Sequence, residues 1–194
     1  MATVTLHGIC TIQSNATNLA KLGPGMSAQQ PHWLRFRGHG TSAGDLLREF
    51  QIARAPVPIV AMVLELDLGL VAHEPKSLSP NRIGISIPGP GDTAIAQLHV
   101  HTGSWEEPIL RYHVAFLLGR LLQDSHLYYG RTHWFDSPFE AVDYFGALAN
   151  VFACEILCPR WLLPRTLRPT LQNVATNFGV PRALAARAPW VLAP

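Results

Sequence analysis

The chain has 194 residues, of which 48% are hydrophobic and only 14% are charged, with a formal net charge of +2. This length allows one domain with a sizeable core, and the small net charge excludes an argument for nucleic-acid binding from charge alone. The low charge content favours a surface that is partly covered by a partner. Three cysteines are too few for a disulfide scaffold, and neither a secretory leader nor a transmembrane segment is expected. We therefore expect a cytoplasmic protein.

The first half of the chain predicts an arm, two helices and three strands. Residues 1–42 have a short apolar start and then a stretch rich in Asn, Gly and Ser, which predicts an irregular or weakly β arm of unknown role. Polar starts and apolar spacing predict helices over 43–53 and 59–66, and a short strand follows at 71–74. Alternating polar and apolar residues over 81–87 and 94–101 predict two strands paired as in a hairpin.

The second half predicts mainly helices. Apolar residues at 110, 114, 117, 118, 121 and 122 predict a helix over about 107–123 with a buried face. An aromatic loop over 128–135 leads to Ser137-Pro-Phe-Glu140, a helix-start pattern, and this helix is expected to reach about Leu157. Two short helices around 170–178 and 181–188 flank Gly179. Together these elements predict an α+β fold, with a small, mostly antiparallel sheet of three or four strands packed on several helices.

Two segments resemble motifs of the ImmA/IrrE metallopeptidase family. Residues 111–122 are similar to the family pattern Arg-Phe-Thr-x-Ala-His-Glu-x-Gly-His-Leu-Leu, and residues 149–159 are similar to the second pattern, Ala-Asn-x-Phe-Ala-x-x-Leu-Leu-Met-Pro, which a zinc-binding Glu precedes. The similarity covers about residues 43–188. It implies a zincin-like domain over 43–194 that ends in a helical hairpin at about 170–188, with the two motif helices side by side in the core.

The chain departs from this family at each position that would carry chemistry. Phe116 and Arg120 stand where the family has its two zinc-binding histidines, Leu117 stands where it has the general-base Glu, and Leu148 stands where it has the third ligand. Zinc requires nitrogen, sulfur or carboxylate donors, and none of these four side chains supplies one. We therefore expect no catalytic residue, no metal and no cofactor, and interpret the chain as a pseudo-peptidase.

The resemblance also implies a partner, because active family members cleave helix-turn-helix repressors. We expect a bacterial regulatory protein that binds such a repressor, or another phage or mobile-element regulator, without cleaving it. One alternative is a metallopeptidase with relocated zinc ligands, although the nine histidines match no zinc signature. A second alternative is nucleic-acid binding through the C-terminal region, where five arginines and no acidic residue follow Glu155. The oligomeric state and the host process are left open.

Several side chains are candidates for partner binding. Arg120 needs an acceptor on its apolar face, and Glu155 is the expected one. This pair would either plug the former zinc position or allow Arg120 to bind an acidic group of a peptide. His113 shares the helical face of Phe116 and Arg120. The remaining candidates are aromatic residues that would either fold over the former cleft or form a binding hot spot: Tyr128, Tyr129, Trp134 and Phe135.

Overall fold

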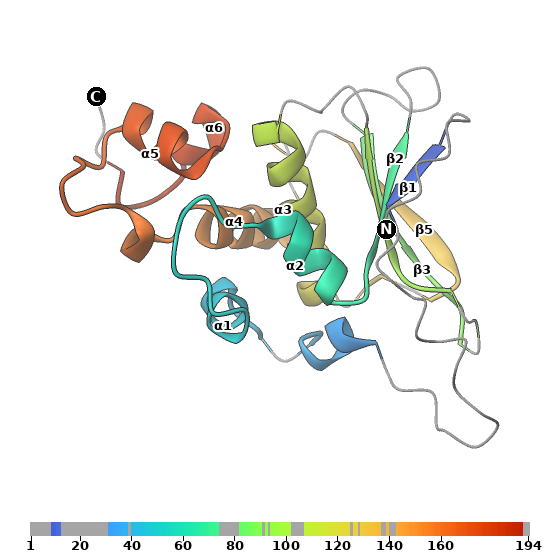
Figure 1. Cartoon of the computed structure of the whole chain (residues 1–194). Coiled ribbons are helices and arrows are strands. Elements are labelled where there is room, and N and C mark those ends of the chain that lie inside the picture. The colour runs from blue at the N-terminus through green and yellow to red at the C-terminus, as the bar shows by residue number, and fades with distance from the viewer. Residues whose placement is uncertain are drawn as a thin grey trace.

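The structure, a computed structural model, has an α+β fold in which helices pack against a mixed sheet (Figure 1). It describes residues 9–12, 31–38, 40–73, 82–90, 92, 94–101, 107–124, 126–127, 129–136, 139 and 143–191. Five strands form the sheet in the order β1-β2-β4-β3-β5. Their bounds are Ile9–Ile12 for β1, Gly69–His73 for β2, Arg82–Ile87 for β3, Gln97–His101 for β4 and Arg131–Asp136 for β5.

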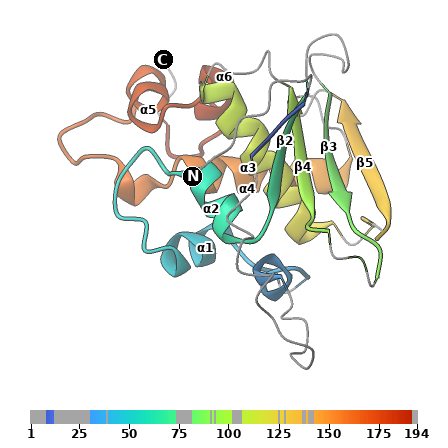
Figure 2. The ribbon, with the colours of Figure 1, turned by 45° about the vertical axis from the view of Figure 1, so that its right-hand side comes forward.

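Most of the strand pairs are antiparallel, as expected. Among the described pairs only β2 and β4 run parallel, while β1–β2, β3–β4 and β3–β5 are antiparallel. The predicted fold class is therefore confirmed, although the sheet has five strands rather than three or four. The additional strands are β1, from the predicted arm, and β5, which lies at the opposite edge (Figure 2).

Strand β5 corrects the prediction of a loop over 128–135. Residues 131–136 pair with β3 from Arg131 opposite Ile87 to Asp136 opposite Arg82. The alternation was present in the sequence, because Thr132 and Trp134 point to one face of the sheet while His133 and Phe135 point to the other. The alternation is difficult to recognise because many residues of this segment are polar. An edge strand exposes much of its length to solvent and therefore tolerates polar residues on both faces.

Helix α3 (Glu107–Gln123) lies at the centre of the molecule and has the bounds that the apolar spacing predicted. All residues from Leu110 to Leu122 are buried. One side of α3 contacts β3 and β4, whose inward residues, such as Ile85 and Leu98, are completely buried. Its other sides contact α2 (Ile59–Glu65) and α4 (Tyr144–Leu157). The helix is therefore surrounded, which explains why a simple amphipathic pattern does not describe it.

A local signal in the sequence accounts for the start of α1. Helix α1 (Ala43–Glu49) begins with a capping box, in which Ser42 and Asp45 exchange side-chain and backbone hydrogen bonds. The predicted helices over 43–53 and 59–66 are present but shorter. Before α1, a short 3-10 helix, η2 (His32–Arg35), buries Trp33, whose backbone N–H donates to Leu66 O at 3.1 Å. The division after residue 42 stays a prediction, although the described residues before it contact the same sheet and core.

The start of α4 corrects another prediction. The helix begins at Tyr144, not at the pattern Ser137-Pro-Phe-Glu140, and Asp143 caps it by accepting a hydrogen bond from Gly146 N at 2.8 Å. Except for Phe139, residues 137–142 lie outside the described residues. Ser137 and Asp143 are both possible N-cap residues for this helix. The tertiary contacts of Asp143, described below, favour the later start.

The C-terminal region forms a docked pair of short helices. After the 3-10 helix η5 (Arg160–Leu162), α5 (Leu171–Phe178) and α6 (Arg182–Ala185) flank Gly179, whose φ of 58° suits glycine. Leu184 and Ala185 are completely buried, and Arg111 of α3 donates to Phe178 O at 3.1 Å. A helix as short as α6, with its apolar side buried, is a poor match to a recognition helix.

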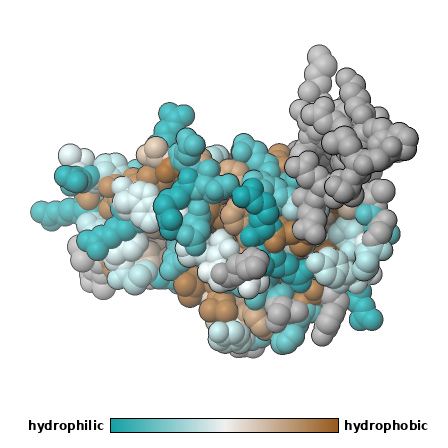
Figure 3. Space-filling view, turned by 90° about the horizontal axis from the view of Figure 1, so that it is seen from below, coloured by the Kyte–Doolittle hydropathy of each residue, from teal (hydrophilic) through white to brown (hydrophobic). Residues whose placement is uncertain are grey.

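Within the described part of the chain, one helical stretch, Tyr144–Leu162, is long and apolar enough to cross a membrane. However, 56% of this stretch is buried inside the protein, and α4 packs against α3. Viewed from below, the hydrophobic residues lie in separate patches between hydrophilic ones (Figure 3). Burial against α3 explains the apolar character of α4 without a membrane.

Gly119 sets the distance between α3 and α4. A Cβ atom at this position would lie 3.0 Å from Phe152 Cδ1 and 3.1 Å from Ala149 Cα, which is backbone of the facing helix. Gly44 in α1 offers a contrast, because a Cβ there would have only Ser42 Oγ nearby, at 3.6 Å.

We predict that Gly119→Ala lowers the free energy of unfolding by about 1–3 kcal/mol, because the helices must separate. Gly44→Ala, the matched control, should raise it by up to about 1 kcal/mol, because alanine favours helix where space is free. Urea denaturation of both variants measures the difference. A stabilising Gly119→Ala would mean that α3 and α4 can move apart at no cost.

Candidate functional site

The candidate site lies where α3 and α4 cross, at the residues that match the two family motifs. Tyr112 of α3 is completely buried, and its hydroxyl donates to Asn150 Oδ1 of α4 at 2.6 Å. The Tyr112 ring stacks on Phe139 with 4.0 Å between the ring centroids. Burial raises the pKa of Tyr112, so its hydroxyl stays protonated and keeps this hydrogen bond. Tyr112 and Asn150 therefore hold the two helices together.

Three of the four positions at which the resemblance would put zinc-site residues are apolar. Phe116 and Leu117 are buried in the core, and Leu148 on α4 is half-buried. The ring of Phe116 packs near the rings of Tyr112 and Phe135, at centroid distances of 6.2 Å and 6.4 Å. Aromatic and aliphatic side chains offer no lone pair to a metal. This part of the site has the chemistry of a core rather than that of a metal centre.

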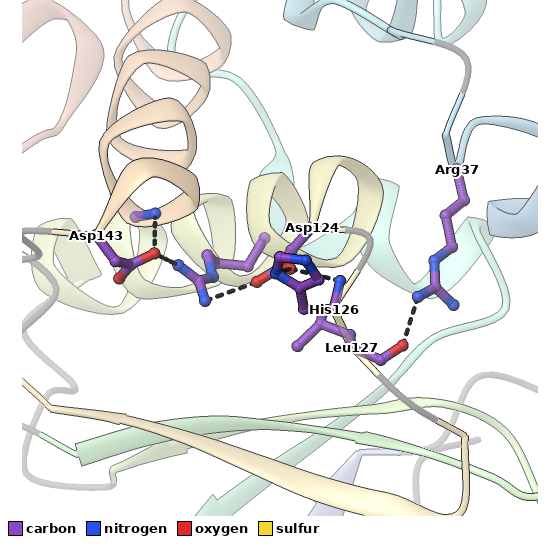
Figure 4. Close-up of polar contacts among 7 residues, drawn as sticks. Arg37, Asp124, His126, Leu127 and Asp143 are labelled. Atoms are coloured by element: carbon purple, nitrogen blue, oxygen red, sulfur yellow. Dashed lines mark hydrogen bonds and ion pairs between the residues drawn. The ribbon is translucent and has the colours of Figure 1, made fainter.

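Arg120 is the charged residue of the site, and two carboxylates neutralise it. Its guanidinium forms ion pairs with Asp124, at 2.7 Å, and with Asp143, and only 9% of its side chain is exposed. Asp124 and Asp143, both labelled in Figure 4, contact this guanidinium through its two terminal nitrogens. The guanidinium carbon lies over the ring of Phe135 in β5, 4.5 Å from the ring centroid, which is a cation–π contact.

This network corrects the expectation that Glu155 pairs with Arg120. Glu155 is exposed on α4, twelve residues after Asp143, which corresponds to about 18 Å along a helix. The sequence contained one of the real partners, because Asp124 follows Arg120 by four residues and thus lies on the same helical face. Asp143 could not be identified in this way, since its approach depends on how α4 packs on α3.

The two aspartates differ in their surroundings. Asp124 is buried and also accepts a hydrogen bond from His126 N at 2.8 Å. Asp143 is partly exposed, and desolvation alone would raise its pKa. The hydrogen bond from Gly146 N and the contact with Arg120 outweigh desolvation, so the pKa of Asp143 lies below its ordinary value. The Asp143 carboxylate is therefore charged at neutral pH and can pair with the guanidinium.

We predict that Arg120→Ala lowers the free energy of unfolding by about 3–5 kcal/mol, because it leaves the buried carboxylate of Asp124 without its counter-charge. The matched control is Arg48→Ala, which removes an exposed ion pair with Asp45 and should leave stability near the wild-type value. Chemical denaturation at neutral pH compares the two. Equal, small losses would show that Arg120 does not hold the helices together and is free to bind a ligand.

The other candidate residues do not gather around Arg120. His113 is buried two turns earlier on α3. Tyr129 is 49% exposed and contacts the guanidinium of Arg37, 5.4 Å from its ring centroid. Trp134 points to the opposite face of the sheet from Phe135. Tyr128 lies outside the described residues. Of the predicted set, the structure brings together Phe116, Arg120 and Phe135.

His113 is neutral at neutral pH. Burial, with a smaller effect of His101, lowers its pKa from 6.5 to about 4. In the unfolded chain His113 takes up a proton near pH 6.5, whereas in the folded chain it does so only near pH 4. Between these values the unfolded state binds more protons, so stability decreases as the pH falls from 6.5 to 4.

We therefore expect the free energy of unfolding to fall between pH 7 and pH 4, with His113 contributing on the order of 3 kcal/mol. His113→Leu should reduce this fall by a similar amount. The comparison uses denaturation curves across the pH range, and the value for the variant at pH 7 separates changed packing from proton uptake. An unchanged pH dependence would show that His113 already carries its proton in the fold.

We next consider whether the described residues could bind a metal ion. Among the described residues, no three His, Cys, Asp or Glu side chains are placed to hold an ion together. Cys154 and Cys158 lie one turn apart on α4 and its C-cap, and both are buried. Burial raises the pKa of both thiols, that of Cys154 to about 11, so neither is a thiolate at neutral pH.

Comparison of the chain with models of known protein families finds no match, and comparison with curated proteins finds none either.

Proposed function

We propose that this protein is a relative of the ImmA/IrrE metallopeptidases that is catalytically inactive as a peptidase and acts by binding a protein partner. The observation that carries the proposal is the Arg120 network. Arg120, at a position where the resemblance would put a zinc-binding histidine, pairs with Asp124 and Asp143. Phe116, at the other such position, packs near the ring of Phe135. The motif residues that remain, such as Gly119, Tyr112 and Asn150, are those that pack α3 on α4. The chain thus has the motif residues that pack the two helices but lacks the residues that would bind zinc, which supports a pseudo-peptidase.

The edge of β5 is the surface that we propose for the partner. In the described part of the chain β5 pairs with β3 on one side only, and no described strand lies along its other edge. An extended segment of another protein can add to such an edge as a further strand. Trp134, which is 36% exposed, and the charged ends Arg131 and Asp136 provide side chains for specificity. Phe135 anchors the strand from its inner face by its contact with Arg120.

The resemblance supports a helix-turn-helix repressor, or another phage or mobile-element regulator, as the partner in a bacterial cytoplasm. A chain that keeps the family scaffold without its zinc ligands would bind such a regulator without cutting it. Direct nucleic-acid binding receives less support, because the short, docked α6 offers no recognition helix.

We predict that Trp134→Ala weakens binding of a helix-turn-helix repressor, the proposed partner, by more than about 2 kcal/mol, roughly 30-fold in Kd, as expected for a central aromatic anchor. Calorimetric titration of the two purified proteins measures the affinity. Trp161→Ala is the matched control, because Trp161 is 62% exposed but lies in η5. It should bind like the wild type.

Two outcomes would contradict the proposal. Loss of binding in Trp161→Ala but not in Trp134→Ala would place the partner on another surface. Cleavage of the regulator in the presence of zinc would favour a metallopeptidase with relocated ligands.

A further inference from the structure

A row of hydrogen bonds crosses the outer face of the sheet, the face opposite α3. His73 Nε2 of β2 lies 2.8 Å from His99 Nδ1 of β4, and His99 Nε2 lies 2.6 Å from Ser86 Oγ of β3. Ser86 Oγ in turn lies 2.7 Å from Thr132 Oγ1 of β5. A serine hydroxyl, an imidazole and a second polar group behind that imidazole thus stand in the order found in nucleophilic hydrolases. Neither the resemblance nor the proposed function uses these residues.

Strand register places the row on this face. Ser86 pairs directly with Gln97 on one side and with Thr132 on the other, and His99 is two residues beyond Gln97. The residues between them, such as Ile85 and Leu98, point to α3 and are completely buried. Because side chains alternate along a strand, the polar residues share the outer face.

Trp134 encloses the two imidazoles. Its ring centroid lies 5.3 Å from that of His99 and 5.8 Å from that of His73. The indole can lie across β3 because residue 84 is glycine, where a Cβ atom would be 2.6 Å from Trp134 Cε3. His99 is only 8% exposed, and burial, with a smaller effect of His73, lowers its pKa to about 4. At neutral pH the His99 imidazole is therefore uncharged and has a lone pair that can accept the proton of Ser86.

The serine is accessible from a cleft. A cleft of about 250 Å³ reaches Ser86 and is lined partly by polar side chains and partly by apolar ones, among them Gln97, Thr132, Pro88 and Ile95. Its volume is below that of most sites for drug-sized ligands, so it suits a small acyl group. The Gln97 amide and the Thr132 hydroxyl flank Ser86 and can donate hydrogen bonds to an oxyanion.

We propose that Ser86, His99 and His73 form a nucleophilic site that hydrolyses esters of small carboxylic acids. Ser86 Oγ attacks the ester carbonyl carbon while its proton passes to His99 Nε2. The C–O bond to the alcohol then breaks, and the leaving oxygen takes that proton from His99. His99 next removes a proton from water, whose oxygen attacks the acyl-serine, and the carboxylic acid leaves as Ser86 regains its proton. His73 is a positioning residue, which accepts the Nδ1–H of His99 and so fixes the tautomer that the first step needs.

The rate of covalent labelling by a fluorophosphonate tests this directly, together with hydrolysis of p-nitrophenyl acetate. Peptide mapping by mass spectrometry should find the label on Ser86. Ser42 is an internal control in the same molecule, because its hydroxyl donates to the Asp45 carboxylate at 2.8 Å and forms no hydrogen bond with any histidine of the described part of the chain. Ser42 should remain unlabelled, and Ser86→Ala should lose both labelling and hydrolysis.

Two further substitutions separate catalysis from a structural role. His99→Gln, which cannot take up the proton, should slow labelling of Ser86 at least about 100-fold. His73→Gln keeps an acceptor for Nδ1–H and should retain activity, whereas His73→Leu should not. Circular dichroism and melting curves verify that each variant is folded.

Labelling of Ser86 and Ser42 at equal rates, no labelling of Ser86, or rapid labelling in a folded His99→Gln protein would overturn the proposal and leave the row as a structural network. None of these results bears on partner binding by the proposed pseudo-peptidase, which is measured with Trp134→Ala and Trp161→Ala.

Discussion

A buried positive charge organises the centre of this protein. Removing a guanidinium from water costs several kcal/mol unless carboxylates and other polar or aromatic groups compensate for it. Arg120 obtains this compensation from three different elements: Asp124 near the end of α3, Asp143 at the start of α4 and the ring of Phe135 in β5. The position of α4 on α3 and the attachment of the edge strand thus both depend on one side chain.

Prediction from the sequence succeeded where the signal is local. Helix α3 was predicted with its observed bounds, because its apolar residues recur at helical spacing from one end to the other. The pairing of β3 with β4 followed from the alternation of polar and apolar residues in both strands. The interpretation of Phe116, Leu117 and Arg120 as degenerate catalytic positions rests on the motif around them and stays a prediction.

Prediction failed where tertiary contacts decide the outcome. The start of α4 was placed at Ser137, because the capping pattern there is stronger than that of Asp143 when each is judged locally. Asp143 is nevertheless the cap, since the same carboxylate also neutralises Arg120. Glu155 was chosen as the partner of Arg120 from helical spacing on α4, but it faces solvent. The row from His73 to Thr132 joins four strands, and nothing in the sequence brings those strands together before the sheet order is known.

The double role of Asp143 restricts how such a chain can change during evolution. The segment between Asp124 and Asp143 contains β5, and residues can be inserted into or deleted from its turns at little cost in loop entropy. The end of the segment has no such freedom, because the carboxylate must return to Arg120 and must also begin a helix. Substitution of Asp143 by asparagine would keep a cap but lose the charge, and substitution by glutamate would keep the charge but lose the short side chain that a cap requires. Related chains that keep an arginine at position 120 are therefore expected to vary in the length of this segment while ending it with aspartate.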